Sequence, residues 1–224
     1  MSNSVNLIEC FTSFQGEGPD SGRTMIILRF KTCNHKCYFC DTAVKMRISM
    51  EASYNLTDIQ ETIYQRAAGL LITGGEPTVP KHFDECVSLL NDLEYPIANV
   101  ESNGFKLPEL IEATDPNKPV KFMYSPKIFG ANDESDARDT LKKLQQYQNV
   151  YIKMVHEPDN KYFMDFMYHV ADTARELITN QRVWLMPMGT NRPELIKNAG
   201  PVFDICERYN FNFSSRSHII FGFV

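Results

Sequence analysis

The sequence predicts an α/β protein with an open, partial βα barrel of about six parallel strands, covering helices and a modified C-terminal region. Three observations support this fold class. Short apolar runs alternate with longer segments of helical periodicity, which is typical of a parallel sheet covered by helices. Glycine and proline mark short turns between these segments. Polar residues follow several strands directly, and in βα barrels the functional residues lie at that end of the strands.

The strand-helix units can be assigned in chain order. The strands are expected at residues 25–30, 70–73, 96–102, 120–126, 149–155 and 182–188, where apolar strand-forming residues cluster. The helices are expected at residues 55–69, 82–95, 136–147, 159–178 and 193–209, where apolar residues recur at helical spacing. Two further strand-like segments, FNFSS and HIIFGFV, close the chain.

Local signals refine some of these helices. Thr57 with Gln60 predicts a capping box at the start of the first helix, and Gly69 is expected to end it. Cys86 and Cys206 fall within helical segments, so they are expected to be buried, inert thiols.

Length and composition indicate the class of protein. The chain has 224 residues, 43% of them hydrophobic, so a single domain spanning residues 1–224 is expected. Dedicated nucleic-acid-binding proteins are basic, and the net charge of −5 therefore predicts no direct nucleic-acid partner. The sequence contains no signal-peptide pattern and no apolar stretch long enough to cross a bilayer. We therefore expect a cytoplasmic protein without a membrane partner.

Three of the six cysteines lie within CNHKCYFCDT, residues 33–42, at the spacing C-x3-C-x2-C. In a reducing compartment such a tight cluster indicates metal or redox chemistry rather than disulfide bonds. One interpretation is a zinc ion with His35 as the fourth ligand. The favoured one is an iron–sulfur cluster held by Cys33, Cys37 and Cys40, which leaves one iron open to another ligand.

Two motifs together point to a family. The cysteine segment directly follows the first expected strand, and Phe39 precedes its last cysteine. The sequence GGEP, residues 74–77, follows the second strand, where glycine allows the main chain to approach a ligand closely. These features resemble the radical S-adenosylmethionine (SAM) superfamily. The resemblance implies a [4Fe–4S] cluster whose open iron binds SAM, and an electron donor such as flavodoxin.

Further motifs narrow the resemblance. SFQGEGPDSGR precedes the first strand, CDT ends the cysteine segment, and TGGEP, ESNG and SPK follow later strands, so the motifs run from residue 13 to residue 127. This combination is similar to the 7-carboxy-7-deazaguanine synthase family, with a looser likeness in VWLMPMG and SHIIFGF. The resemblance implies a homodimeric lyase that converts 6-carboxy-5,6,7,8-tetrahydropterin into 7-carboxy-7-deazaguanine, a 7-deazapurine precursor of queuosine. The reaction abstracts hydrogen at C6, contracts the ring and releases ammonia.

The resemblance also implies roles for individual residues, although the cofactor itself carries the radical chemistry. Cys33, Cys37 and Cys40 would bind the cluster, and Thr42 would bind Mg²⁺. The residues implied in SAM binding are Phe39, Asp41, Gly74, Gly75, Glu76, Glu101, Asn103, Ser125, Pro126 and Lys127. The residues implied in pterin binding are Phe14, Gln15, Gly16, Glu17, Arg29, Thr73, His218 and Val224, so the N-terminal segment 1–24 would complete the active site.

Some residues also permit simpler interpretations. Thr42 could cap a loop, Arg29 could form a surface salt bridge, and QGEG is turn-like by composition. Arg216 stands where the family pattern has a glutamine, and we expect the pocket to differ there.

Other functions fit parts of the pattern. Glycyl-radical-activating enzymes share the C-x3-C-x2-C segment but lack QGEG combined with CDT. A non-catalytic zinc-binding module would contain zinc in place of iron and sulfide, so metal analysis distinguishes it. A degenerate homologue is disfavoured because the three cysteines, GGEP and CDT are intact.

Overall fold

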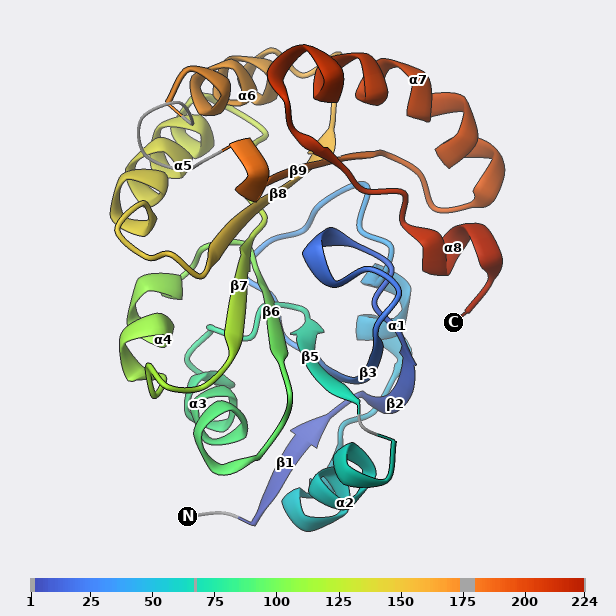
Figure 1. Ribbon diagram of the computed structural model, residues 1–224, viewed down its shortest axis with the longest axis vertical. Coiled ribbons are helices and arrows are strands. Elements are labelled where there is room, and N and C mark those ends of the chain that lie inside the picture. Colours follow the sequence, from blue (N-terminus) through green and yellow to red (C-terminus); the bar gives the residue numbers. More distant parts are fainter. Residues whose placement is uncertain (1–2, 67, 174–179, 224) are drawn as a thin grey trace.

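A curved, open sheet forms the centre of the molecule (Figure 1). The computed structural model describes residues 3–66, 68–173 and 180–223. The eight strands lie in the order β10-β9-β8-β7-β6-β5-β3-β2; β2 runs antiparallel to β3, and all other neighbours are parallel. These strands are β2 (Glu9–Phe14), β3 (Thr24–Phe30), β5 (Gly69–Gly74), β6 (Ala98–Ser102), β7 (Val120–Tyr124), β8 (Val150–His156), β9 (Val183–Pro187) and β10 (Asn212–Phe213).

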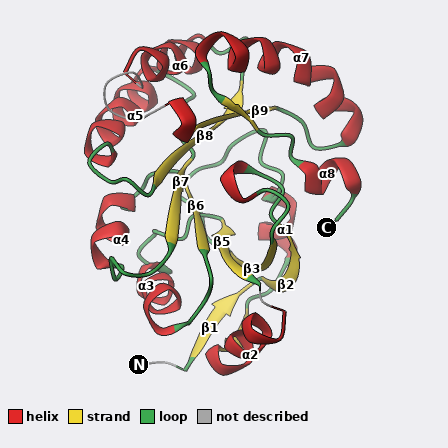
Figure 2. Cartoon of the chain, viewed as in Figure 1, coloured by secondary structure: helices red, strands yellow, loops and turns green. Residues whose placement is uncertain are grey.

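Helices surround the outer face of the sheet (Figure 2). The α-helices are α1 (Ala43–Ile48), α2 (Leu56–Arg66), α3 (Phe83–Asp92), α4 (Leu107–Ala113), α5 (Ala131–Leu144), α6 (Lys161–Thr173), α7 (Arg192–Tyr209) and α8 (Ser217–Phe221). The described residues also form the short 3₁₀ helices η1 (Gly18–Asp20) and η2 (Asn180–Arg182). A separate antiparallel pair joins β1 (Ser4–Leu7) to β4 (Ala52–Asn55). None of the described helices has the length and apolar composition needed to span a membrane.

The predicted fold class is confirmed. The expected strands are β3, β5, β6, β7, β8 and β9, and the expected helices are α2, α3, α5, α6 and α7. Residues 174–178 of the helix expected at 159–178 lie outside the described residues. Cys86 and Cys206 are buried as predicted. The elements β1, β2, β4, α1 and α4 were not predicted.

The expectation of a strand at residues 218–224 is wrong, because Ser217–Phe221 forms α8. The segment pairs with no neighbouring strand, and the N–H of Ile219 donates instead to the carbonyl of Arg216 at 3.0 Å. Gly222 then ends the helix in the left-handed conformation, with φ of 70°. Strand propensity is not expressed without a partner strand.

The start of α2 also differs from the prediction. Asn55 Oδ1 accepts the N–H of Thr57 at 2.8 Å, so Asn55 provides the cap. Gln60 bonds instead to the main chain of Glu94, at 2.8 Å through its amide nitrogen and 2.6 Å through its oxygen. Gly69 does not end the helix but begins β5. Asn55, directly before the helix, therefore caps α2, while Gln60 takes a distant partner.

Alternation along β3 separates the outer core from the barrel interior. Ile26, Leu28 and Phe30 belong to the buried core that the helices cover. Ile27 and Arg29 lie on the other face and line an interior cavity. The inward face of the sheet therefore carries the residues that form the candidate site.

Polar residues fill the interior near the amino ends of the strands. The N-terminal segment that contains η1 enters the barrel there (Figure 1). Gln15 donates to Asn99 Oδ1 at 3.2 Å, and Asn99 donates to Asp20 at 2.9 Å. Lys121 Nζ donates to both Asp20 oxygens at 2.9 Å. These buried groups satisfy one another and hold the segment inside the barrel.

Candidate active site

The loop after β3 places the three cysteines at the carboxyl ends of the strands. Cys33, Cys37 and Cys40 are all partly buried. Burial raises the pKa of the Cys33 thiol and raises the pKa of Cys37 to about 11, while the positive charge of Lys127 opposes both shifts. Without a metal these two thiols are protonated at neutral pH. A metal must therefore displace their protons when it binds.

Aromatic and polar contacts hold the cysteine loop from outside. Phe129, in the loop before α5, lies 6.0 Å from the ring of Phe39, 6.1 Å from Tyr38 and 6.5 Å from His35. The Tyr38 hydroxyl donates to Glu157 Oε2 at 2.8 Å, directly after β8. The conformation of the loop therefore depends on the ends of β7 and β8.

The GGEP turn packs main chain against main chain at the start of the cysteine loop. The N–H of Gly75 donates to Phe30 O at 2.9 Å, and the N–H of Glu76 donates to Thr32 O at 2.7 Å. A Cβ on Gly74 would lie 2.2 Å from Phe30 O, and a Cβ on Gly75 would lie 2.1 Å from Thr32 O. Gly74 also has φ of 128°. Both positions therefore require glycine for packing, in addition to any approach to a ligand.

Glu76 joins this turn to the end of β6. Its side chain is buried, and Oε1 accepts from the Thr78 hydroxyl at 2.7 Å and the Ser102 hydroxyl at 2.8 Å. Oε2 accepts the main-chain N–H of Asn103 at 2.6 Å. Burial raises the pKa of the Glu76 carboxyl, and the hydrogen bond from Asn103 opposes the rise. The side-chain amide nitrogen of Asn103 donates to Asn34 Oδ1 at 2.8 Å, which extends the connection to the cysteine loop.

His82 occupies a position for which the sequence indicated no partner. The buried ring stacks on Phe30 at 4.6 Å, and Nε2 accepts the N–H of Thr32 at 3.1 Å, one residue before Cys33. Burial lowers the pKa of His82. Because Nε2 accepts, the neutral ring carries its proton on Nδ1, which lies 3.7 Å from Glu85 Oε2. His82 thus helps to hold the start of the cysteine loop.

The interior cavity has a volume of about 240 Å³ and brings the predicted residues together. Its wall includes Phe14, Gln15, Gly16, Glu17, Arg29, Cys33, Cys37, Phe39, Cys40, Asp41, Thr42, Thr73, Gly74, Gly75, Glu76, Glu101, Asn103, Ser125, Lys127 and His218. Pro126 lies between two lining residues but does not line the cavity itself. Val224 lies outside the described residues.

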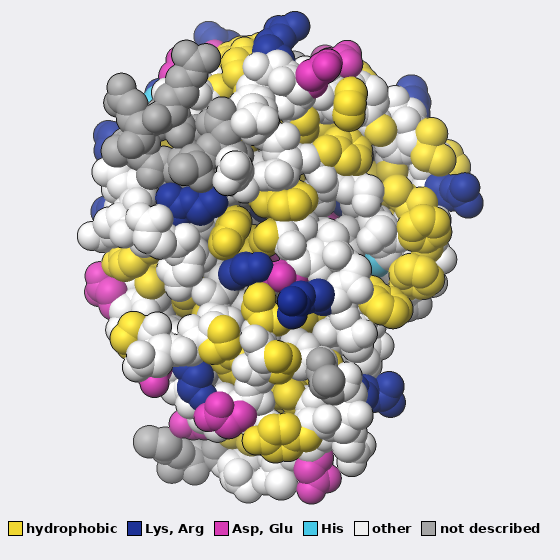
Figure 3. Space-filling model, in the orientation of Figure 1, with side chains coloured by type: hydrophobic (Ala, Val, Ile, Leu, Met, Phe, Trp, Pro, Cys, Tyr) yellow, Lys and Arg dark blue, Asp and Glu magenta, His cyan; other side chains and the backbone are white. Residues whose placement is uncertain are grey.

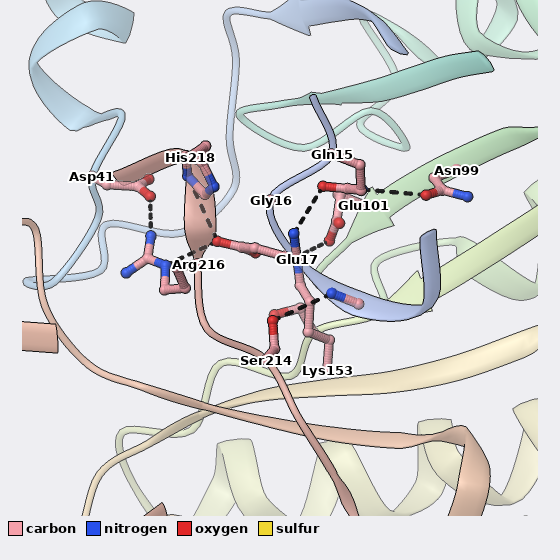
Figure 4. A network of polar contacts seen from close by, with 12 residues as sticks. Gln15, Gly16, Glu17, Asp41, Asn99, Glu101, Lys153, Ser214, Arg216 and His218 are labelled. Atoms are coloured by element: carbon pink, nitrogen blue, oxygen red, sulfur yellow. Dashed lines mark hydrogen bonds and ion pairs between the residues drawn. The ribbon is translucent and has the colours of Figure 1, made fainter. Parts of the chain in front are cut away.

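A charged network crosses this cavity (Figure 4). Lys153 Nζ bonds to Glu17 Oε2 at 2.7 Å and also pairs with Glu101. Arg216 Nε donates to Glu17 Oε1 at 2.9 Å. Burial alone would raise the pKa of Glu17, but the charges of Lys153 and Arg216 hold it well below its usual range. Glu101 and Glu17 raise the pKa of Lys153 against the effect of burial, so this lysine stays charged.

The sequence reasoning assigned no role to Lys153 and left that of Arg216 open. Lys153 interrupts the otherwise apolar strand VYIKMVH, as Arg29 interrupts β3, and that signal could have identified it. Arg29 Nε donates to Glu9 Oε2 at 2.6 Å, and only 13% of its side chain is exposed. Arg29 therefore forms an ion pair on the cavity wall, not on the outer surface.

Comparison with known families decides the class of the protein. The family described as the Radical SAM superfamily matches residues 27–190, which contain both the cysteine loop and the GGEP turn. The chain belongs to the radical SAM superfamily. The predicted membership is confirmed, and the non-catalytic zinc module is set aside.

Two relatives that share one name match nearly the whole chain. The 7-carboxy-7-deazaguanine synthase of Hyperthermus butylicus is 26% identical over 96% of this chain and 92% of its own. The protein of that name from Halobacterium salinarum is 26% identical over 94% of this chain and 88% of its own. The crystal structure of QueE from Escherichia coli, 17% identical, aligns with a TM-score of 0.59 over 94% of this chain and 92% of that one. The predicted resemblance is thus confirmed, and the solved structure supports the fold.

The donor set fits the cofactors of a radical SAM protein. Three thiolates bind a [4Fe–4S] cluster and leave one iron for SAM. Within the described ranges, no group of three or more His, Cys, Asp or Glu side chains surrounds a single metal position. Lys127, whose Nζ lies 2.8 Å from Ser125 Oγ, supplies positive charge beside the cysteines.

Proposed function

We propose that this radical SAM protein is a carbon–nitrogen lyase that converts 6-carboxy-5,6,7,8-tetrahydropterin into 7-carboxy-7-deazaguanine. Hydrogen abstraction at C6, ring contraction and loss of ammonia make up the reaction, and the product is a 7-deazapurine precursor of queuosine. The observation that carries the proposal is one cavity lined by the cysteine loop, the GGEP turn and the QGEG segment. The full-length relatives named 7-carboxy-7-deazaguanine synthase support it.

The cofactor end of the cavity would be formed by the cysteine loop and its neighbours. When bound, the cluster and SAM supply a 5′-deoxyadenosyl radical. Cys33, Cys37 and Cys40 would hold the cluster. SAM would lie along Phe39, Asp41, Gly74, Gly75, Glu76, Glu101, Asn103, Ser125, Pro126 and Lys127. The ammonium of Lys127 suits the carboxylate of the methionine moiety, because it is a cation on the cavity wall beside the cysteines.

The substrate end would be formed by the N-terminal segment and the inward side chains of the strands. Arg29 would pair with the substrate carboxylate. Glu17 and Gln15 would accept and donate hydrogen bonds at the edge of the pyrimidine ring, which offers both donors and acceptors. The other contacts would come from Phe14, Gly16, Thr73, His218 and Val224. In this proposal residues 1–24 complete the site of a single domain spanning residues 1–224.

We also propose that Mg²⁺ binds at Thr42. The hydroxyl of Thr42 lies 3.4 Å from Cys40 Sγ on the cavity wall. Mg²⁺ takes few protein ligands when substrate and water complete its octahedron, so a single hydroxyl is compatible with it. Thr42→Ala should weaken the stimulation of turnover by Mg²⁺ and leave cluster content unchanged.

The proposed setting is a cytoplasmic homodimer served by an electron donor such as flavodoxin. Ile196, Phe203, Phe221 and Phe223 are exposed large apolar side chains. Hydrophobic side chains gather over α8 (Figure 3), and such a patch suits a second copy of the chain. Mass measurement in solution tests the dimer.

The test is anaerobic reconstitution with iron and sulfide, followed by addition of dithionite, SAM, Mg²⁺ and the pterin. Mass spectrometry should detect 7-carboxy-7-deazaguanine. Cys33→Ala should abolish its formation, whereas Cys86→Ala, which removes a buried thiol of the helical core, should not. Formation of 5′-deoxyadenosine without this product would show that the protein is an active radical enzyme but that the pterin is not its substrate. A glycyl-radical-activating enzyme would give that result.

A further inference from the structure

Arg216 joins three segments of the chain around the cavity. Its side chain is only 8% exposed. Nε donates to Glu17 Oε1 at 2.9 Å, Nη1 donates to Gly189 O at 2.6 Å, and Nη2 donates to the Asp41 carboxylate (Figure 4). The acceptors belong to the N-terminal segment, the loop after β9 and the end of the cysteine loop. The planar, five-donor geometry of arginine suits such a junction.

The backbone of Arg216 is held in an unfavourable conformation. Its φ is 55° and its ψ is 50°, in the left-handed region that non-glycine residues rarely adopt. Such strain persists where the surrounding contacts determine the conformation. The turn at Arg216 directs α8 across the wall of the cavity, where His218 also lies. The side-chain contacts and the direction of the tail are therefore linked.

Polar contacts hold the C-terminal tail, residues 214–223, over the N-terminal segment. No residue of α8 is buried. The N–H of Ser217 donates to Gly16 O at 3.1 Å, and the Ser13 hydroxyl donates to Phe223 O at 2.7 Å. Segments with little buried apolar surface open more easily than the core. The part of the tail from Ser217 onward is therefore expected to open more easily than the barrel, whereas Ser214 and Arg216 are buried.

Glu17 receives cationic partners from two sides. Lys153 reaches Oε2 from the rigid strand β8, whereas Arg216 reaches Oε1 from the tail. His218 Nε2 lies 3.9 Å from Oε1. Each carboxylate oxygen can accept more than one hydrogen bond. The bonds from Lys153 and Arg216 therefore leave lone pairs of Glu17 free to accept from a ligand. The surroundings of Glu17 are complete only while the tail is docked.

We propose that Arg216 is a positioning residue for the pterin, which acts through Glu17 and keeps the C-terminal tail closed over the bound substrate. It orients the Glu17 carboxylate to accept the N–H groups of the pyrimidine ring. Its bond to Asp41 makes closure of the tail depend also on the end of the cysteine loop. This inference rests on the proposed function.

The test is a double-mutant cycle on pterin binding. Isothermal titration under anaerobic conditions would measure the affinity of SAM-loaded, unreduced protein for 6-carboxytetrahydropterin. Arg216→Gln should weaken binding about tenfold, since a charge-assisted hydrogen bond is lost. Arg208→Gln, which changes an exposed arginine of α7, should leave it unchanged. In a Glu17→Gln background, the further effect of Arg216→Gln should be clearly smaller than about tenfold, because only the bonds to Gly189 and Asp41 that hold the tail remain to be lost.

Hydrogen exchange gives a readout independent of activity. In Arg216→Gln, the amide of Ser217, which donates to Gly16 O, should exchange about tenfold faster than in the wild type, because the tail undocks more often. The amides of β6 should be unaffected. Arg216→Lys keeps the charge without the planar fork and should give a smaller effect in both measurements. If Arg216→Gln does not fold, Arg216→Lys takes its place in both measurements.

Two results would overturn the inference. One is an equal loss of affinity from Arg216→Gln with and without Glu17, which would mean that the arginine does not act through this carboxylate. The other is wild-type affinity and wild-type exchange in Arg216→Gln. If the wild-type protein neither binds the pterin nor forms the product, the proposed function fails, and this inference fails with it. If the wild type forms the product normally and Arg216→Gln has wild-type affinity and exchange, this inference fails while the proposed function stands.

Discussion

The main-chain N–H of Asn103 donates to Oε2 of Glu76 at 2.6 Å, across the ends of the neighbouring strands β5 and β6. Glu76 is 1% exposed, and donors from these two turns reach both of its carboxylate oxygens. Glu76 therefore holds the main-chain turns after β5 and β6 in place, and these turns form part of the cavity wall.

Replacing Glu76 by Gln should destabilise the protein and weaken SAM binding. The amide nitrogen cannot accept, so at least one of the donors from Thr78, Ser102 and Asn103 is left without its partner, at a cost of about 2 kcal/mol. Urea denaturation of the reduced, metal-free protein measures the free energy of unfolding, and titration measures SAM affinity. Glu61→Gln, at an exposed position of α2, is the matched control. Equal stability of the two variants would contradict the structural role of Glu76.

Gly75→Ala should separate the GGEP turn from the cysteine loop. The added Cβ would lie 2.1 Å from the carbonyl oxygen of Thr32, which is main chain and cannot rotate away. We expect SAM affinity to fall by more than about tenfold, since several main-chain contacts shift together. The SAM-induced change in the electron paramagnetic resonance spectrum of the reduced cluster monitors this. Gly200→Ala is the control, because a Cβ there meets nothing within 4 Å. An unchanged spectral response in Gly75→Ala would refute the packing argument.

Lys153→Met should be strongly destabilising at neutral pH. It leaves Glu17 and Glu101 as buried carboxylates without their shared lysine, and removal of one partner of a buried ion pair costs about 3–5 kcal/mol. The pKa values of both carboxyls should rise in the folded variant. A carboxyl with a raised folded pKa stabilises at low pH and loses that contribution as pH rises. The difference in free energy of unfolding between Lys153→Met and the wild type should therefore become smaller as the pH falls towards about 5. A deficit independent of pH would exclude this electrostatic explanation.

His82 should make the stability of the metal-free protein depend on pH. Burial lowers its folded pKa below the unfolded value of about 6.5, so the neutral ring stabilises above that pH and the contribution is lost as pH falls. Protonation would also turn Nε2 into a donor facing the N–H of Thr32. The free energy of unfolding should decline from about pH 7 to about pH 5.5, and less steeply in His82→Gln. Burial lowers the pKa of the other four histidines too, so part of the slope should remain. Identical slopes would rule out His82 as a contributor.

Local chemistry made much of the site predictable. Cys33, Cys37 and Cys40 lie close together in sequence after one strand, and Gly74 and Gly75 follow the next strand. Parallel strands bring such ends to one edge of a sheet, and the cavity indeed contains both sets. The residues from QGEG also reached the cavity, although β2 and η1, which flank this motif, were not predicted as elements.

Contacts between distant residues explain what was missed. The partners of Lys153 depend on the curvature of the sheet, which places it against Glu101 across the intervening strand β7. His82 gains its role only because α3 packs beside the start of the cysteine loop. The segment from His218 to Phe223 has strand-forming residues but pairs with neither edge strand of the sheet, β2 or β10. Gln60 of the predicted capping box bonds instead to the main chain of Glu94, which is distant in sequence.

By itself the sequence determined the class of fold, the cysteine cluster and the glycine turn, because hydrophobic period, cysteine spacing and glycine geometry are local properties of the chain. Only the tertiary structure decided that Glu76 faces inward to other turns, that Lys153 and Arg216 hold Glu17, and that the C-terminal tail is helical and closes the cavity wall. Those features depend on the burial of charges beside partners far away in sequence. The cost of leaving such charges unpaired, not local propensity, determines where the side chains lie.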